Sequence, residues 1–304
     1  MDKDNKAEIE AFFRRLNKEF GHKKSVTNES GVIDKSIKDD AKEPSSEIIP
    51  QIDAVVIFAL KSPERDMFLK ACAKNYNDDV RNGVAFRIVE IESTNRSVKL
   101  AIATQREMGL VSSAVLSTIA LMTYKPQIII MGGICAGVEG KVSIGDVIVA
   151  NPTFNHEAGK RTDNGFEANY THRGLLRSVD DICELISEDK ELLRHIRDSW
   201  DFKTGKPKTE LTVHIVPMGS GSSVITETQT IEKIAVHNRK ITGIDMEAFA
   251  VAQSAYETLG TETPWLVAKG VQDYANNDKN DESREYAAFV SAKFIIEFIK
   301  RFFS

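Results

Sequence analysis

Carboxylates stand where several apolar runs of this sequence end, and they are the residues best placed to do chemistry. They are Glu64, Asp245, Glu247 and Asp273. Taken singly, a carboxylate at a strand end is more often a helix cap or a salt-bridge partner than a functional group. Sites in α/β folds nevertheless gather at strand ends. Several carboxylates together with a turn of small residues therefore favour a functional site.

The turn of small residues is predicted in the stretch 127–150. The run 128–131 is short and rich in β-branched residues, which is typical of a strand buried on both faces, and a second strand is predicted over 146–150. Between them, Gly132 and Gly133 allow a sharp turn and a ligand close to the backbone. Alone, these glycines favour an ordinary strand pair with a tight connection, because neither a phosphate-loop lysine motif nor a dinucleotide fingerprint is present.

Composition argues against several classes of function. The 304 residues are 41% hydrophobic and 28% charged, and a net charge of −5 gives no attraction toward nucleic acid or an anionic membrane. No apolar run approaches the ~20 residues that span a bilayer, and the N-terminus lacks a signal-peptide core. Cys72, Cys135 and Cys183 are widely spaced, so they predict neither a disulfide framework nor a metal site. A reducing cytoplasm is the simplest interpretation.

The first 50 residues differ from the rest of the chain. Residues 5–20 carry apolar side chains at helical spacing, which predicts an amphipathic helix. Residues 21–50 are polar and predict a flexible or loosely docked linker. The helix either packs back on the main domain or docks a protein partner or second subunit, and the sequence favours neither. We therefore predict a helix with a linker over 1–50 and one globular domain over 51–304.

Apolar runs alternate with helical patterns after residue 53, and this order predicts an α/β fold with a layered sheet. The predicted strands are 54–60, 86–91, 98–104, 128–131, 146–150, 212–216, 241–244 and 265–271. The predicted helices are 64–74, 111–124, 175–200, 230–237, 248–259 and 284–303. The polar stretch 151–170 is predicted as an irregular loop, and so long a loop in a compact domain is more often functional than idle.

Several segments together resemble the nucleoside phosphorylase and methylthioadenosine (S-adenosylhomocysteine) nucleosidase superfamily. They are AVVIFALKSPE, EMGLVSSAVLS, KPQIIIMGGICAGVEGKVSIGDVIVANP, MGSGSSVI, ITGIDMEAFAVAQ and VAKGVQDYAN. They occur in the family's order and cover nearly all of residues 53–300. The resemblance implies a three-layer α/β/α fold with a central mixed, strongly twisted sheet of the nucleoside phosphorylase type. It also implies a homo-oligomer, expected to be a homodimer, without cofactor or metal.

The same resemblance implies roles for individual residues. Asp273 matches the acid that protonates purine N7, and Glu64 matches the base that takes a proton from the attacking water. Glu247 and Met246 match the pair that holds the ribose. Cleavage of an N-glycosidic bond passes through an oxocarbenium-like sugar, so it needs one acid at the leaving group and one base at the water. The residues expected to line the purine pocket are Ile134, Cys135, Ala136, Gly137, Val224 and Ser222.

Hydrolysis is favoured over phosphorolysis at the position of the phosphate site. The phosphorylase branch has an arginine two residues before the glycine matched by Gly133 and a serine after it. Here these residues are Met131 and Ile134, which cannot hold a dianion. The sequence therefore predicts a purine nucleosidase that releases adenine from an adenine nucleoside or nucleotide. The alternatives are a methylthioadenosine/S-adenosylhomocysteine nucleosidase and a non-catalytic nucleotide sensor that signals through the N-terminal helix.

The substrate's 5′ end is predicted from basic residues near the expected pocket. The candidates for binding a 5′-phosphate, as in AMP or ATP, are Lys160, Arg161, Arg106 and Lys269. Each alone is at least as typical of a solvated surface. His156 is predicted to lie at the surface or at the substrate's edge. The loop NPTFNHEAGK and the tail EYAAFVSAKF look most like an effector-associated branch of nucleosidases, for which a role in antiphage defence is expected.

Overall fold

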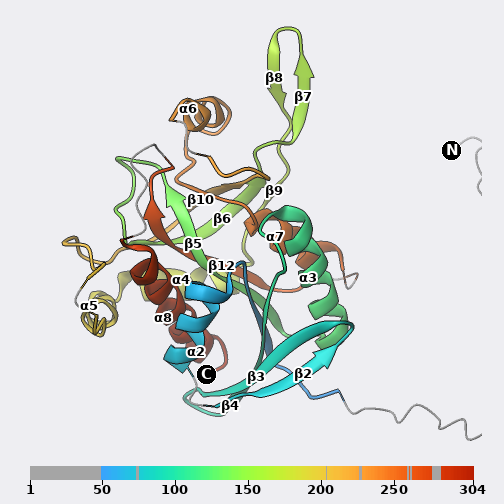
Figure 1. Cartoon of the computed structure of the whole chain (residues 1–304), viewed down its shortest axis with the longest axis vertical. Helices are drawn as coiled ribbons and strands as arrows, with labels where there is room; N and C mark the ends of the chain where they lie inside the picture. Colours follow the sequence, from blue (N-terminus) through green and yellow to red (C-terminus); the bar gives the residue numbers. More distant parts are fainter. Residues whose placement is uncertain are drawn as a thin grey trace, which may run out of the picture. The chain divides into compact units, whose positions relative to one another are not determined.

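Buried strands form the centre of this computed structural model (Figure 1). The structure describes residue 260 and the ranges 49–72, 75–202, 204–225, 228–258, 262–275 and 282–304. The predicted helix 5–20 and nearly all of the predicted linker 21–50 lie outside these residues. The domain boundary at residue 50, the protein partner of the helix and the homo-oligomer therefore stay predictions.

The main sheet is mixed and holds ten strands among the described residues. Nine lie side by side in the order β11 (Gly243–Asp245), β10 (Val213–Ser220), β6 (Val147–Asn155), β12 (Trp265–Asp273), β5 (Ile128–Gly137), β1 (Ala54–Phe58), β4 (Ser97–Thr104), β3 (Val84–Glu92) and β2 (Asn77–Arg81). The tenth, β9 (His172–Arg173), pairs with β6. Because β11 also pairs antiparallel with the end of β5, the strands from β11 to β5 close into a ring.

Helices cover both faces of the sheet, since neighbouring residues of a buried strand point to opposite sides. Val55 of β1 belongs to the core under one helical layer, and Val56 belongs to the core under the other. The first layer contains α3 (Leu110–Tyr124) and α7 (Ala248–Glu257), and the second contains α2 (Asp66–Cys72), α4 (Arg177–Glu188), α5 (Lys190–Asp198) and α8 (Arg284–Phe302). The predicted three-layer α/β/α fold is confirmed (Figure 1).

Two predictions about the stretch 127–150 are wrong. The chain does not turn at Gly132 and Gly133, because β5 continues through them to Gly137 and pairs with β12 over most of its length. The predicted strand pair is also absent from the described residues, since β12 lies between β5 and β6. A late strand inserts between two strands that are neighbours in sequence. This insertion places Lys269 of β12 opposite Gly133 and Asp273, at the end of β12, opposite Ala136.

The stretch 151–170 is more regular than predicted. β6 extends to Asn155, and a two-stranded hairpin follows, formed by β7 (Gly159–Thr162) and β8 (Gly165–Ala168). In Figure 1 this hairpin projects beyond the main sheet near α6 (Thr228–His237). The predicted helix 175–200 is two helices, because Asp189 leaves the helical conformation and its carboxylate caps α5. None of the helices in the described part of the chain is long and apolar enough to cross a membrane.

Candidate active site

Three parallel strands bring reactive side chains to one edge of the sheet. β5 lies between β1 and β12 and runs in the same direction as both. Side chains that follow these strands therefore meet at one edge. Glu64 lies in a π-helical turn, η1 (Lys61–Arg65), just after β1, and Asp273 is the last residue of β12. β11 runs antiparallel to the end of β5, with Ile244 opposite Ala136. It adds the carboxylates of Asp245, its last residue, and of Glu247, two residues further along the chain.

These side chains border a cavity of about 340 Å³, which we call the active-site cavity. That volume lies in the range of small-molecule sites. The lining residues are Ala59, Leu60, Glu64, Met108, Ile134, Cys135, Ala136, Ser223, Val224, Ile225, Ile244, Asp245, Met246, Glu247, Gln272, Asp273, Ala275 and Arg284. An apolar wall with a few convergent polar groups is the composition expected for a site that binds a flat, partly polar ligand.

Glu64 is buried in the wall of this cavity with both carboxylate oxygens hydrogen-bonded. The N–H of Leu60 donates to Oε2 at 2.8 Å, and the N–H of Ile134 donates to Oε1 at 3.1 Å. Gly133 leaves room for the carboxylate, because a Cβ there would stand 2.5 Å from Oε1. Burial raises the pKa of Glu64 to about 7, although Lys269 and the two backbone donors act in the opposite direction. A carboxylate with this pKa suits a general base near neutral pH.

Lys269 forms a buried ion cluster with two carboxylates at the neighbouring wall. Its Nζ lies 2.7 Å from Oδ2 of Asp245 and 2.8 Å from Oε2 of Glu247. Burial alone would lower the pKa of Lys269, but attraction by the carboxylates outweighs it, and the pKa is raised above its usual range. Oε1 of Glu247 accepts hydrogen bonds from the N–H of Gly109 at 3.0 Å and from Nε2 of Gln105 at 3.3 Å. Glu247 is therefore held in one orientation.

Asp273 is buried, and the backbone and side chains beside it orient its carboxylate. The N–H of Ala275 donates to Oδ1 at 2.9 Å, and Nε2 of Gln272 donates to Oδ2 at 3.0 Å. Cys135 also lines the cavity, but burial raises the pKa of its thiol well above the usual range. A thiol in that state is a packing group, because the thiolate is the nucleophile. The cavity therefore offers carboxylate chemistry rather than thiol chemistry.

The family model of the phosphorylase superfamily matches residues 54–303. The chain belongs to this superfamily. Among solved structures, a futalosine hydrolase mutant of Helicobacter pylori has the same fold, with a TM-score of 0.67 over 82% of this chain and 99% of that chain. At 15% identity, this likeness shows the fold alone. The fold and the superfamily inferred from the sequence segments are thus confirmed.

Curated relatives within the superfamily include several nucleosidases. An uncharacterized protein of Sinorhizobium fredii, y4jS, is 32% identical over 64% of this chain and 48% of its own length. A 5′-methylthioadenosine/S-adenosylhomocysteine nucleosidase of Exiguobacterium sp. is 25% identical over 64% of this chain and 77% of its length. The ATP nucleosidase Cap17 of Escherichia coli is 22% identical over 72% of this chain and 45% of its length. The chain thus spans about half the length of y4jS and Cap17.

Most residues expected to bind the substrate do line the active-site cavity. They are Ile134, Cys135, Ala136, Val224, Met246 and Glu247. Gly137 and Ser222 are not among the lining residues. The Cα of Gly137 faces the side chains of Val142 and Val271, which fill the space beside it. Ser222 is exposed, and its N–H donates to Oε2 of Glu157 at 3.0 Å. Gly137 and Ser222 therefore lie near the active-site cavity without lining it.

The predicted phosphate-binding cations lie in three different places. The prediction for Lys269 is wrong, because its ammonium is buried and held by two carboxylates of the cavity wall. Arg161 lines a second cavity, and Lys160 is exposed on β7. Arg106 is exposed and lines a third hollow, next to the active-site cavity. Among the described residues, the four cations therefore do not form one phosphate site.

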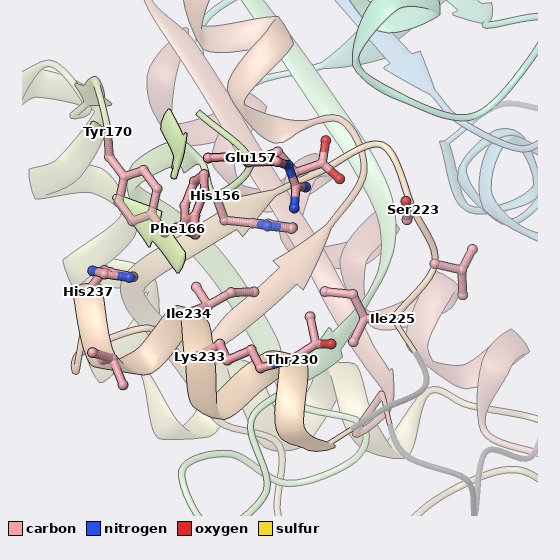
Figure 2. A pocket seen from close by; sticks show the side chains of 13 residues that line it. His156, Glu157, Phe166, Tyr170, Ser223, Ile225, Thr230, Lys233, Ile234 and His237 are labelled. Atoms are coloured by element: carbon pink, nitrogen blue, oxygen red, sulfur yellow. The ribbon is translucent and has the colours of Figure 1, made fainter. Parts of the chain in front are cut away.

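The second cavity, which we call the hairpin cavity, has a volume of about 700 Å³ and lies between α6 and the residues around the β7–β8 hairpin. It shares Ser223, Val224 and Ile225 with the active-site cavity. Figure 2 shows His156 pointing into the space between the hairpin residues and α6. His156 does not lie at the surface, since it is only 8% exposed, and its expected place at the substrate's edge stays a prediction. Burial lowers the pKa of His156, which favours the neutral ring.

Several lining residues were not predicted from the sequence. Leu60 and Met108 lie in segments that carried the resemblance, but nothing in their spacing marked them as ligands. Gln105, which holds Glu247, likewise follows a strand without any motif around it. Arg284 begins α8 and reaches the cavity only because α8 packs below β5 and β12. Residues brought in by packing alone leave no pattern in the sequence.

Proposed function

We propose that the protein is a purine nucleosidase that hydrolyses the bond between a purine and its ribose. The observation that carries this proposal is a pair of buried carboxylates on one cavity, Glu64 and Asp273, in different surroundings. Two carboxylates in different environments can act as a base and an acid in one reaction. The relatives named as nucleosidases support the same class of reaction.

In the proposed reaction, a water attacks C1′ of the ribose as the bond to the purine breaks. Ionised Glu64 takes a proton from that water, for which its raised pKa is suited. Asp273, acting as the acid, gives a proton to purine N7, so that the base leaves as a neutral molecule. Glu247, which Lys269 and Gln105 hold in place, accepts hydrogen bonds from the ribose hydroxyls. The products are the free purine and a free reducing sugar.

Hydrolysis fits the described walls better than phosphorolysis does. Met131 is fully buried in β5, and Ile134 presents an apolar side chain to the cavity. The ammonium of Lys269 is already neutralised by Asp245 and Glu247. An attacking phosphate dianion needs fixed donors and uncompensated positive charge. Water needs only the base.

For the substrate, we propose an adenine nucleotide with a 5′-phosphate, as in AMP or ATP. The relative named ATP nucleosidase supports this choice. Methylthioadenosine is the second candidate, because Leu60 and Met108 are apolar residues of the cavity wall. Several curated relatives carry that name. The two candidates differ in what the 5′ end of the ribose must meet, namely cations or hydrocarbon.

The test is a panel of adenosine, AMP, ATP and methylthioadenosine, with free adenine measured by chromatography. Free adenine and a reducing sugar are expected, at a rate that inorganic phosphate does not raise. A sugar 1-phosphate seen by phosphorus NMR would overturn hydrolysis. Binding without any release of adenine would instead support the sensor that uses the pocket only to bind. Faster cleavage of methylthioadenosine than of AMP and ATP would reject the nucleotide preference.

A further inference from the structure

A hollow of about 710 Å³ lies between η1, β2, β3, β4 and α3, and we call it the cationic groove. Four cationic side chains line it, namely Lys61, Arg65, Arg87 and Arg106, and Asp78 is the one carboxylate among its lining residues. The whole chain has a net charge of −5. A concentration of positive charge in an acidic protein is unlike the average surface, and a concave wall strengthens its field.

The cationic groove adjoins the active-site cavity, because neighbouring residues of the chain line one and then the other. Leu60 lines the cavity and Lys61 the groove, while Glu64 lines the cavity and Arg65 the groove. Gln105 lies at the boundary, since it lines the groove and donates a hydrogen bond to Glu247 in the cavity. The groove therefore meets the cavity beside Glu247.

Two features show that the groove has unused binding capacity. Lys61 and Arg106 have no carboxylate partner among the described residues, whereas Arg65 pairs with Asp66 at 2.7 Å. At the boundary, Oγ1 of Thr104 and Oε1 of Gln105 are buried without a hydrogen-bond partner in the described part of the chain. Buried polar atoms normally have a hydrogen-bond partner, so two such atoms without a partner beside a cavity point to a ligand.

We propose that the cationic groove holds the 5′-phosphate chain of a purine nucleotide substrate. This inference rests on the proposed function, which places the ribose at Glu247 and the base at Asp273. A ribose bound at Glu247 would lie beside the groove, because Gln105 lines the groove and contacts Glu247. Guanidinium groups suit phosphate because their paired N–H donors match phosphate oxygens, and the Thr104 hydroxyl can donate to another oxygen.

The hairpin cavity is not placed to bind the same phosphates, because it adjoins the active-site cavity on the side expected to hold the purine. Its shared residues, Ser223, Val224 and Ile225, belong to the side expected to hold the base. Arg161 therefore lies beyond the purine rather than beyond the ribose. A phosphate chain attached to the ribose would reach Arg106 and Lys61 and leave Arg161 without contact. This assignment moves the phosphate site from the predicted hairpin cations to the groove.

The experiment compares two double variants of the full chain, each of which removes two cations. Lys61→Ala with Arg106→Ala changes the cationic groove, and Lys160→Ala with Arg161→Ala is the matched control on the hairpin. Release of adenine is measured from ATP, AMP and adenosine. In the groove variant, the ratio of kcat/KM for ATP to that for adenosine should fall about 10- to 100-fold. In the hairpin variant, the ratio should change less than about twofold.

Failure of this inference differs from failure of the proposed function. If the groove variant loses ATP and adenosine cleavage equally, or if only the hairpin variant changes the ratio, the cationic groove does not bind the phosphates. If no purine compound releases its base, the proposed function is wrong, and calorimetry with inorganic tripolyphosphate then tests the groove. Binding by the wild type that the groove variant loses supports the site. No binding, or equal binding by both proteins, overturns it.

Discussion

The buried ion cluster and the cationic groove both adjoin Gln105, and they differ in whether their charges are compensated within the protein. In the buried ion cluster, Lys269 contacts Asp245 and Glu247 at 2.7 and 2.8 Å, and its side chain is 1% exposed. In the cationic groove, Lys61 and Arg106 are exposed and have no carboxylate partner among the described residues. The first region has its charges compensated within the protein. The second leaves positive charge for something else to compensate.

The difference separates what each region can do. A buried, compensated cluster has a fixed geometry, so it can orient Glu247 toward a ribose, but it has no charge left to attract a free anion. Exposed cations cost little to hold in water and keep their attraction for a phosphate, although salt weakens it. Removing one charge should therefore damage folding in the buried cluster and substrate selection in the groove.

The largest expected difference is in the free energy of unfolding, when a lysine is replaced by methionine in each region. Lys269→Met leaves two buried carboxylates without their cation, which should lower the free energy of unfolding by ~3–5 kcal/mol. Lys61→Met changes an exposed residue and should stay within ~0.5 kcal/mol. Urea unfolding followed by circular dichroism measures both. Equal losses of unfolding free energy in the two variants would show that the fold does not depend more on the charge of Lys269 than on that of Lys61.

A second comparison uses two aspartates. Asp273→Asn keeps the shape of the side chain but removes the proton donor, so kcat should fall by ~10² to 10⁴ while the melting temperature changes little. Asp78→Asn removes the carboxylate from the cationic groove and should leave kcat near the wild-type value, with a lower KM for ATP. Adenine release under steady-state conditions measures both. Near-native turnover in a folded Asp273→Asn protein would remove Asp273 from the mechanism.

The sequence predicted those parts of the site that follow from strand ends and local motifs. Glu64, Glu247 and Asp273 were expected at strand ends, and the structure brings all three to one cavity. The superfamily and the α/β/α fold were recognised from ordered segments and are confirmed. Each of these features depends on a short run of residues. Such runs keep their meaning without knowledge of the neighbouring strands.

The parts that were not predicted depend on pairing between distant segments. The position of β12 between β5 and β6 could not be read from either strand, because all three are continuous apolar runs that fit several neighbours. Lys269 was predicted to be a cation free to bind phosphate. Its burial could not be predicted, because it follows from the position of β12 between β5 and β6. Its partners, Asp245 and Glu247, come from another strand end. The same dependence on pairing conceals Gln105 and its contact with Glu247.

A third prediction asks whether the catalytic geometry depends on the glycine beneath Glu64. Gly133 and Gly140 both have positive φ values, +137° and +79°, which favour glycine. A Cβ at Gly133 would stand 2.5 Å from Oε1 of Glu64, whereas a Cβ at Gly140 has nothing within 4 Å. Both alanine variants should lose some stability through backbone strain.

Only Gly133→Ala should also displace the Glu64 carboxylate. A shift of ~1 Å in a catalytic group can cost ~10²-fold in rate. We therefore expect kcat to fall by about that factor in Gly133→Ala and to stay within about twofold in Gly140→Ala. Steady-state adenine release, at a temperature where circular dichroism shows both variants folded, measures the difference. Equal rates in the two variants would mean that Glu64 does not need its present position.

The last and smallest effect concerns pH. Burial raises the pKa of Glu64 to about 7 from the ordinary value of 4.5. A general base must be ionised, so on the acid side kcat/KM for adenosine should fall about tenfold for each pH unit below 7. Stability should show the opposite dependence. The folded protein holds the Glu64 proton more tightly than the unfolded chain does, so this contribution is fully present below pH 4.5 and is lost as pH rises through 7. Glu64→Gln should therefore gain stability relative to the wild type between pH 5 and 8, while its turnover stays low throughout.

A wild-type rate that does not change between pH 5 and 8 would show that the base is another group. Adenosine is the right substrate for this profile, because phosphate groups that titrate near pH 6 would add their own dependence.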